Sequence, residues 1–137
     1  MSTRSLTHIV EDGEILTTIY RHMDGYPEGH GADLAAFLNT GRLTQGLSMA
    51  AGEPVEFNGA GCLAAALVAH LKDGPGNIYI YKAGESDCGE ECVYTITCHR
   101  NNEIRLKAEE RIWKGVDVPA EWKVLFDDVP DKWTIGA

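Results

Sequence analysis

The residues best suited to chemistry are concentrated in one short stretch, residues 20–31. The stretch reads Tyr20-Arg21-His22-Met23-Asp24-Gly25-Tyr26-Pro27-Glu28-Gly29-His30-Gly31. Histidine and carboxylate side chains exchange protons and also bind metal ions, so His22, Asp24 and His30 could serve acid–base catalysis or hold a metal. However, no nucleophile, base and orienting group can be placed together, and binding is therefore favoured over catalysis.

A β-hairpin ahead of this stretch determines what lies beside it. Asp12-Gly13 predicts a type I′ turn within a hairpin over residues 4–22, because both turn positions need positive φ. Counting outward from the turn places Arg4 directly opposite Arg21. The same count gives three further pairs, which are Val10 with Ile15, His8 with Thr17, and Leu6 with Ile19.

The expected pair of arginines predicts an anion between or beside them. Directly opposed positions bring Cβ atoms to ~5 Å. At an effective dielectric of about 20, two like charges at this distance repel by about 3 kcal/mol before water screens them. The anion is either internal or external, and the guanidinium fork suits both. An internal carboxylate would come from Asp24, Glu28 or Asp33, and an external anion would be a phosphate or a partner's carboxylate.

The loop after the hairpin leads into a helix that has glycines at its start. Asp24-Gly25-Tyr26-Pro27 predicts a tight turn, and Gly29 and Gly31 flank His30 ahead of a helix over residues 32–38. Backbone N–H groups at such a helix start attract anions, although the glycine spacing is neither a Walker loop nor a Rossmann fingerprint. We therefore expect a ligand site, with no catalytic residue, metal ion or cofactor assigned. Its residues are Arg4, Arg21, His22, Asp24, Tyr26 and His30.

Length and charge limit the class of protein. A chain of 137 residues with 44% hydrophobic and 24% charged residues predicts a single globular domain over residues 1–137. The net charge of −9 disfavours direct binding to nucleic acid or to anionic membranes, but it permits contact with a basic protein surface. No apolar run is long enough to span a membrane, and the polar N-terminus is unlike a secretory signal, so we expect a cytosolic protein.

The cysteines within residues 88–98 first suggest a zinc site. Cys92 and Cys98 fall on one expected strand, where the rise of ~3.3 Å per residue separates them by about 20 Å. They cannot share one tetrahedral ion at that separation. A disulfide between Cys88 and Cys92 is disfavoured by a reducing cytosol. We therefore expect free, partly buried thiols.

Two further helices are expected. The clearer one covers residues 60–71, where Leu63, Leu67 and Leu71 recur at helical spacing. The other covers residues 120–126 and begins after Pro119, because proline favours the first turn of a helix. Residues 43–49 indicate a short helical turn or a covering loop.

The second half of the chain is rich in strands. Residues 77–82 have apolar side chains on both faces, which predicts a central strand. Residues 92–98 and 104–108 predict a hairpin whose three-residue loop sets Ile96 opposite Leu106. Its other face, with Arg105 and Lys107, is a second possible binding surface. The expected architecture is α+β: an antiparallel sheet of about five strands, two main helices packed on one face, and a short C-terminal helix.

Four segments of the chain are similar to short motifs of one known family. These are Met1-Ser2-Thr3-Arg4-Ser5-Leu6, then Tyr20-Arg21-His22-Met23-Asp24-Gly25-Tyr26-Pro27, Tyr79-Ile80-Tyr81, and Glu90-Glu91-Cys92-Val93-Tyr94. On these residues the chain resembles a family of small proteins that is common in phages and prophages, and the likeness covers most of its length. The resemblance implies a viral accessory protein that acts in the bacterial cytoplasm.

The function expected in this context is non-enzymatic counter-defence by binding. The protein would inhibit a host defence complex such as CRISPR-Cas, or it would sequester a nucleotide-type signal with Arg4 and Arg21, and it could form a homo-oligomer. Two alternatives remain open. One is an enzyme that cleaves such a nucleotide with His22, Asp24 and His30, and the other is a structural or regulatory phage protein.

Overall fold

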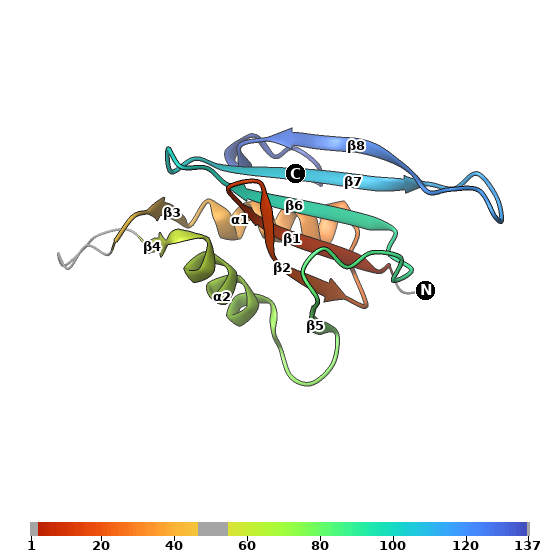
Figure 1. The fold of residues 1–137 in the computed structure, drawn as a ribbon, viewed down its shortest axis with the longest axis horizontal. Helices are drawn as coiled ribbons and strands as arrows, with labels where there is room; N and C mark the ends of the chain where they lie inside the picture. Colours follow the sequence, from red (N-terminus) through yellow and green to blue (C-terminus); the bar gives the residue numbers. More distant parts are fainter. Residues whose placement is uncertain (1–2, 47–54, 137) are drawn as a thin grey trace.

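Six strands form one mixed sheet, which is the scaffold of the molecule. The computed structural model describes residues 3–46 and 55–136. The order across the sheet is β5-β2-β1-β6-β7-β8 (Figure 1). The strands are β1 Ser5–Glu11, β2 Glu14–Arg21, β5 Ile78–Tyr81, β6 Cys92–Cys98, β7 Ile104–Ile112 and β8 Glu121–Asp128. A separate parallel pair joins β3, Gly41–Thr44, to β4, Val55–Asn58.

Both main helices pack on one face of the six-stranded sheet and enclose the core with it. Helix α1, Ala32–Leu38, follows a π-helical turn at Pro27–Gly31, and helix α2, Gly59–Leu71, follows β4. Leu63, Leu67 and Leu71 are all buried, as their helical spacing predicts. The sheet contributes Ile9, Ile19, Ile78, Tyr94, Ile96 and Leu106 to the same core.

The fold class is confirmed as α+β with two main helices, but the strands are arranged differently from the prediction. β1 runs parallel to β6, so the sheet is mixed and not wholly antiparallel. β5 lies at an edge of the sheet, and the prediction of a central strand there is wrong. Its apolar residues serve two different contacts: Ile78 is buried in the core, and Tyr81 stacks on Tyr20 with 4.8 Å between ring centroids.

Residues 121–126 belong to strand β8, and the helix predicted over residues 120–126 is wrong. β8 pairs antiparallel with β7, and Leu125 has no partner in the register between Val124 and Phe126. Such a bulge interrupts the alternation of inward and outward side chains in a strand. Val124, Leu125 and Phe126 therefore form a continuous apolar run, which periodicity alone cannot distinguish from a helix. A 3₁₀ turn at Pro130–Lys132 follows β8.

The first hairpin has the predicted turn. Asp12 and Gly13 have φ values of 53° and 79°, as a type I′ turn requires, and Val10 pairs with Ile15 as the count predicts. Leu16 is then bulged out of the register. Every later pair in the hairpin is shifted by one residue as a consequence, which overturns the predicted pairs beyond Val10.

The shifted register separates the two arginines that the sequence places together. Ser5, and not Arg4, pairs with Arg21. A shift of one residue turns a side chain to the opposite face of the sheet. Arg4 and Arg21 therefore point to opposite faces, and the predicted arginine pair is wrong.

The second hairpin has the predicted register. Cys98 pairs with Ile104 and Ile96 pairs with Leu106, across the three-residue loop that the sequence predicts.

The segment expected as a helical turn or covering loop, residues 43–49, is described only in part. Residues 43–44 are the last two residues of strand β3, and residues 47–49 lie outside the described residues. No helix within residues 3–46 and 55–136 is long and apolar enough to cross a membrane.

Candidate functional site

His30 is the most deeply buried of the residues predicted to form a site. It is 1% exposed, and its ring lies edge-on to that of Tyr94, with 5.0 Å between centroids. Nδ1 lies 3.3 Å from Nη1 of Arg21, and Nε2 lies 3.0 Å from Oγ1 of Thr7. A guanidinium can only donate, so Nδ1 accepts and Nε2 carries the proton that it donates to Thr7.

This environment keeps His30 neutral. Burial, and then the charge of Arg21, lower the pKa of His30 to about 3. A protonated ring would direct a second N–H group and a positive charge at the guanidinium. Both ring nitrogens already bond to protein groups, so His30 is a core residue that a substrate in solution does not reach.

Arg21 is held by the loop that follows it. Its Nε donates to the carbonyl oxygen of Met23 at 2.7 Å, and its Nη1 donates to His30. Among the carboxylates expected beside it, Asp33 instead contacts His70, with 2.9 Å between Oδ1 and Nε2. A carbonyl oxygen and an imidazole thus replace the predicted carboxylate. These two acceptors are sufficient because Arg4 lies on the other face of the sheet. The repulsion between two neighbouring arginines, from which an anion was predicted, therefore does not arise.

The turn after Arg21 is clamped to the sheet. The Gly25 N–H donates to the carbonyl oxygen of Thr3 at 2.8 Å, and the Tyr94 hydroxyl donates to the carbonyl oxygen of Gly25 at 2.7 Å. A Cβ atom at residue 25 would lie 2.6 Å from Oγ of Ser5. Residue 25 is therefore glycine because the loop touches β1, and no approaching anion is needed to explain it.

The other predicted residues do not converge with His30. Nδ1 of His22 lies 2.9 Å from the Tyr20 hydroxyl, while Asp24 and Tyr26 are exposed. Within the described ranges, no group of three or more histidine, cysteine or acidic side chains could hold a metal ion. The structure therefore brings together only Arg21 and His30 of the six predicted site residues. Ligand binding by any of the six stays a prediction.

Arg4 lines a groove on the face of the sheet opposite to that of Arg21. The groove lies at the end of the sheet away from the Asp12-Gly13 turn. The groove has a volume of about 800 Å³ and is open to solvent. The guanidinium carbon of Arg111 lies 4.6 Å from the centroid of the Trp113 ring, so the two side chains stack. Sequence reasoning missed Arg111 and Trp113; the available signal was a tryptophan in the polar segment after a strand. The groove is lined by Arg4, Gly89, Glu90, Glu91, Glu110, Arg111 and Trp113.

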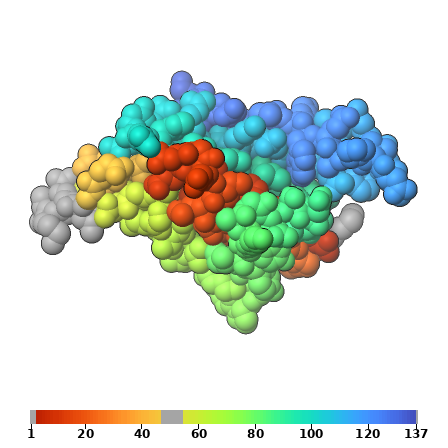
Figure 2. Space-filling view, viewed as in Figure 1, coloured from red at the N-terminus to blue at the C-terminus, as the bar shows by residue number. Residues whose placement is uncertain are grey.

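The β7–β8 hairpin projects from the sheet and exposes apolar side chains at its end. Trp113, Val116 and Val118 are 72%, 84% and 42% exposed, and we call these three residues the hairpin tip. The connection between β7 and β8 extends beyond the other strands on the right of Figure 1. In Figure 2 its blue surface likewise stands out on that side, beyond the green surface of the segment before β6. The hairpin tip and the groove share Trp113.

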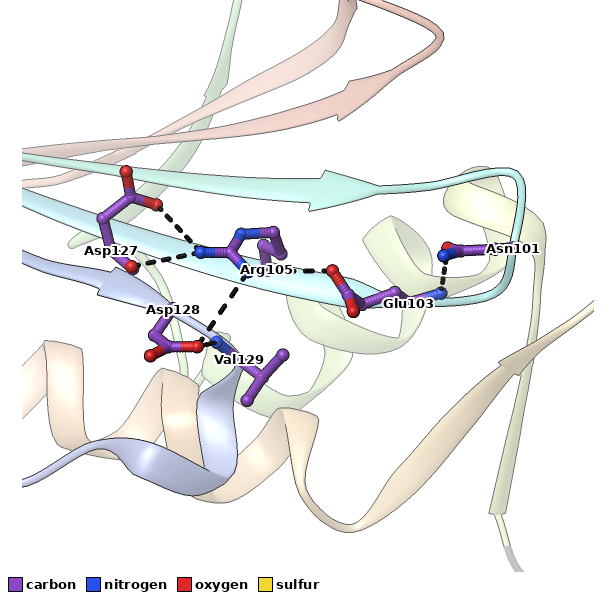
Figure 3. Close-up of polar contacts among 6 residues, drawn as sticks. All are labelled: Asn101, Glu103, Arg105, Asp127, Asp128 and Val129. Carbon is purple, nitrogen blue, oxygen red and sulfur yellow. Dashed lines mark hydrogen bonds and ion pairs between the residues drawn. The ribbon is translucent and has the colours of Figure 1, made fainter.

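Arg105, on the second surface that the sequence indicates, is neutralised within the chain. Its guanidinium nitrogens lie 3.7 Å from Glu103, 3.8 Å from Asp127 and 3.9 Å from Asp128 (Figure 3). Nη2 also donates to the carbonyl oxygen of Asp127 at 3.2 Å. Lys107 on the same strand contacts Glu109 at 3.8 Å. Both cationic side chains of this surface are therefore already paired with carboxylates of the same chain.

The cysteines are free thiols, as the sequence predicts. Cys92 and Cys98 are buried, Cys88 is half-buried, and Cys62 is exposed on α2. Burial, as the largest cause, raises the pKa of both Cys92 and Cys98 to about 11. The two thiols on β6 are therefore protonated and shielded, and they behave as small apolar core residues.

Comparison of the chain with family models, with curated proteins and with solved structures finds no match.

Proposed function

We propose that this protein acts by binding a protein partner through the hairpin tip, without catalysing a reaction. The observation that carries the proposal is the exposure of Trp113, Val116 and Val118 at the end of a projecting hairpin. Clustered apolar side chains left in water mark a surface that a partner covers. Tryptophan and arginine are also the residues most enriched at the energetic centres of protein interfaces, and Arg111 stacks on Trp113 here.

The surroundings of His30 support binding over catalysis. A general base must reach its substrate and must titrate near the working pH. His30 is buried, with both nitrogens bonded to Thr7 and Arg21, and its pKa is lowered to about 3. The alternative of a nucleotide-cleaving enzyme built on His22, Asp24 and His30 therefore has no support from this geometry.

The register of the first hairpin favours a protein partner over a nucleotide signal. Sequestration of a nucleotide was expected at a corner formed by Arg4 and Arg21. These arginines point to opposite faces, and Arg21 is already bonded to Met23 and His30. That corner does not exist in this fold, whereas the apolar hairpin tip is suited to a protein surface.

The net charge indicates the kind of partner. At −9, the chain is attracted over long distances to a basic protein surface, such as one that normally holds nucleic acid. Together with the likeness to phage accessory proteins, this favours counter-defence in the bacterial cytoplasm, by occupying a basic surface of a host defence complex. The hairpin tip would supply most of the binding energy and the charge would speed the encounter.

A pair of matched variants tests the proposal. Val116→Asp places a charge on the hairpin tip, and Val55→Asp places one on β4, where the native valine is 56% exposed. Immobilised native protein, Val116→Asp and Val55→Asp would each be incubated with host lysate, and captured proteins quantified by mass spectrometry. We expect Val116→Asp to lose a specific partner by about tenfold or more, which corresponds to about 1.4 kcal/mol, and Val55→Asp to retain it.

Two results would contradict the proposal. The first is a partner that both variants retain equally, which would remove the hairpin tip from the interface. The second is an incubation with nucleotides that returns a shortened product, which would establish an enzyme. A binding protein of the proposed kind leaves nucleotides intact, and its partner is released as salt rises.

A further inference from the structure

The groove beside the hairpin tip contains two arginines, Arg4 and Arg111, and the charge of Arg4 also acts on the nearby Tyr20 hydroxyl. Among residues 3–46 and 55–136, neither Arg4 nor Arg111 makes a side-chain hydrogen bond or an ion pair. Glu90, Glu91 and Glu110 line the same groove, but none of them lies within ion-pair distance of either guanidinium.

The other arginines of the molecule differ in this respect. Arg105 is surrounded by carboxylates, Arg100 donates to Asp12 at 2.7 Å, and Arg42 lies 3.5 Å from Glu56. Arg21 bonds to Met23 and His30. In a chain with an excess of acidic residues, two unpaired guanidiniums in one groove are not explained by a shortage of carboxylates.

Arg111 is held in the groove by packing, whereas Arg4 is an exposed side chain that lies beside Gly89. Arg111 stacks on Trp113, and its Nε is covered from solvent without an acceptor. Arg4 lies against Gly89, where a Cβ atom would come within 2.7 Å of its Nη1. Gly89 has φ of +77°, so both its conformation and this contact favour glycine. Side chains that are held in place before binding lose less conformational freedom when a ligand arrives.

We infer that Arg4 and Arg111 form a subsite for a carboxylate, and that Trp113 offers its open face to a flat group next to that carboxylate. The planar guanidinium fork matches a carboxylate with two parallel hydrogen bonds. Glu90, Glu91 and Glu110 repel any anion in the groove, and they repel a dianionic phosphate more strongly than a carboxylate with a single charge. The inference rests on the proposed function in one respect, which is that the carboxylate belongs to the bound protein partner.

Benzoate is a suitable probe, because it joins one carboxylate to one flat ring and needs no partner. The full chain, labelled with ¹⁵N, would be titrated with benzoate while the arginine Nε–H and tryptophan indole signals are followed by NMR. We expect saturable shifts of the Arg4, Arg111 and Trp113 signals. Inorganic phosphate in the same buffer is expected to bind several-fold more weakly.

Three variants make the test specific. Arg4→Gln and Arg111→Gln should each weaken benzoate binding by about tenfold, the factor for one charged hydrogen-bonded contact of about 1.4 kcal/mol. Arg100→Gln removes the same charge at the opposite end of the sheet, from an arginine that contacts Asp12, and should leave the affinity unchanged. Arg4→Lys, which keeps the charge but loses the fork, should give an intermediate affinity.

The outcomes separate this inference from the proposed function. Native protein without saturable shifts, a loss of equal size in Arg100→Gln, or tighter binding of phosphate than of benzoate would each overturn the carboxylate subsite. In those cases a partner lost only by Val116→Asp would still support the proposed function. Benzoate binding that needs both arginines, in a protein whose hairpin tip captures no partner, would support the subsite and overturn its assignment to a protein carboxylate.

Discussion

Arg21 donates to Nδ1 of His30 across 3.3 Å at the edge of the core, so a permanent cation stands beside a histidine that is kept neutral. The contact joins the last residue of β2 to the π-helical turn that precedes α1. Residues 20–31, which appear the most catalytic in the sequence, therefore have a structural role through this contact. It also makes the stability of that fold depend on pH.

Acidification should unfold the protein through His30. In the unfolded chain the pKa of histidine is about 6.5, whereas in the folded protein the pKa of His30 is about 3. Between these values the unfolded state binds one more proton, so the free energy of unfolding falls as the pH falls. The contribution of this residue is about 1.4 kcal/mol per pH unit. Urea unfolding at a series of pH values from about 7 to about 4 measures this slope.

Two variants isolate the contribution of His30. His30→Gln has an amide that can accept from Arg21 and donate to Thr7, but it does not titrate. It should lower the slope by about 1.4 kcal/mol per pH unit. His99→Gln makes the same substitution at an exposed position and serves as the matched control. Equal slopes in native protein and His30→Gln would show that the fold does not lower the pKa of His30.

Alanine substitutions at two glycines should have opposite effects on stability. A Cβ atom at residue 25 would lie 2.6 Å from Oγ of Ser5 and 2.8 Å from the carbonyl oxygen of Thr3, so Gly25→Ala should destabilise the fold by about 1–3 kcal/mol. Gly61 lies within α2 with nothing near its Cβ position, so Gly61→Ala should stabilise by about 0.5–1 kcal/mol. The melting temperatures of the two variants, each compared with that of the native protein, measure these effects. Gly25→Ala with native stability would mean that the turn does not rest on β1.

The cysteines should react with an alkylating reagent in the order of their exposure. Cys62 is exposed and should be modified first, and Cys88 should follow more slowly because burial and nearby acidic residues raise its pKa. Cys92 and Cys98 should react only after unfolding. Iodoacetamide treatment followed by peptide mass spectrometry, with and without urea, gives the order. Rapid modification of Cys92 in the folded protein would contradict the burial of β6.

Local patterns predicted the parts of the fold that depend on local chemistry. The positive φ values of Asp12 and Gly13, the helix that contains Leu63 and Leu67, and the pairing of Ile96 with Leu106 all follow from turn type or from spacing. Each of these features is decided within a short segment. The packing of both helices on one face follows from their apolar stripes.

The two main errors have the same cause, which is one bulged leucine in each of two strands. Leu16 shifts the first hairpin and so separates Arg4 from Arg21, and Leu125 makes β8 resemble a helix. A bulge adds one unpaired residue to a strand, so a register counted by strict alternation is wrong beyond it. The groove that Arg4 and Arg111 both line was beyond prediction as well, because it depends on the parallel pairing of β1 with β6.

That parallel pairing also determines when the chain can fold. β1 needs β2 on one side and β6 on the other, and β6 begins only at Cys92. During synthesis the first hairpin leaves the ribosome before β5 and β6, so both of its edges are unpaired and open to other chains. Contacts between segments so distant in sequence form slowly, because a long loop must close first. Folding of the core therefore follows synthesis of most of the chain, and the nascent hairpin is the stage most exposed to aggregation and to chaperones.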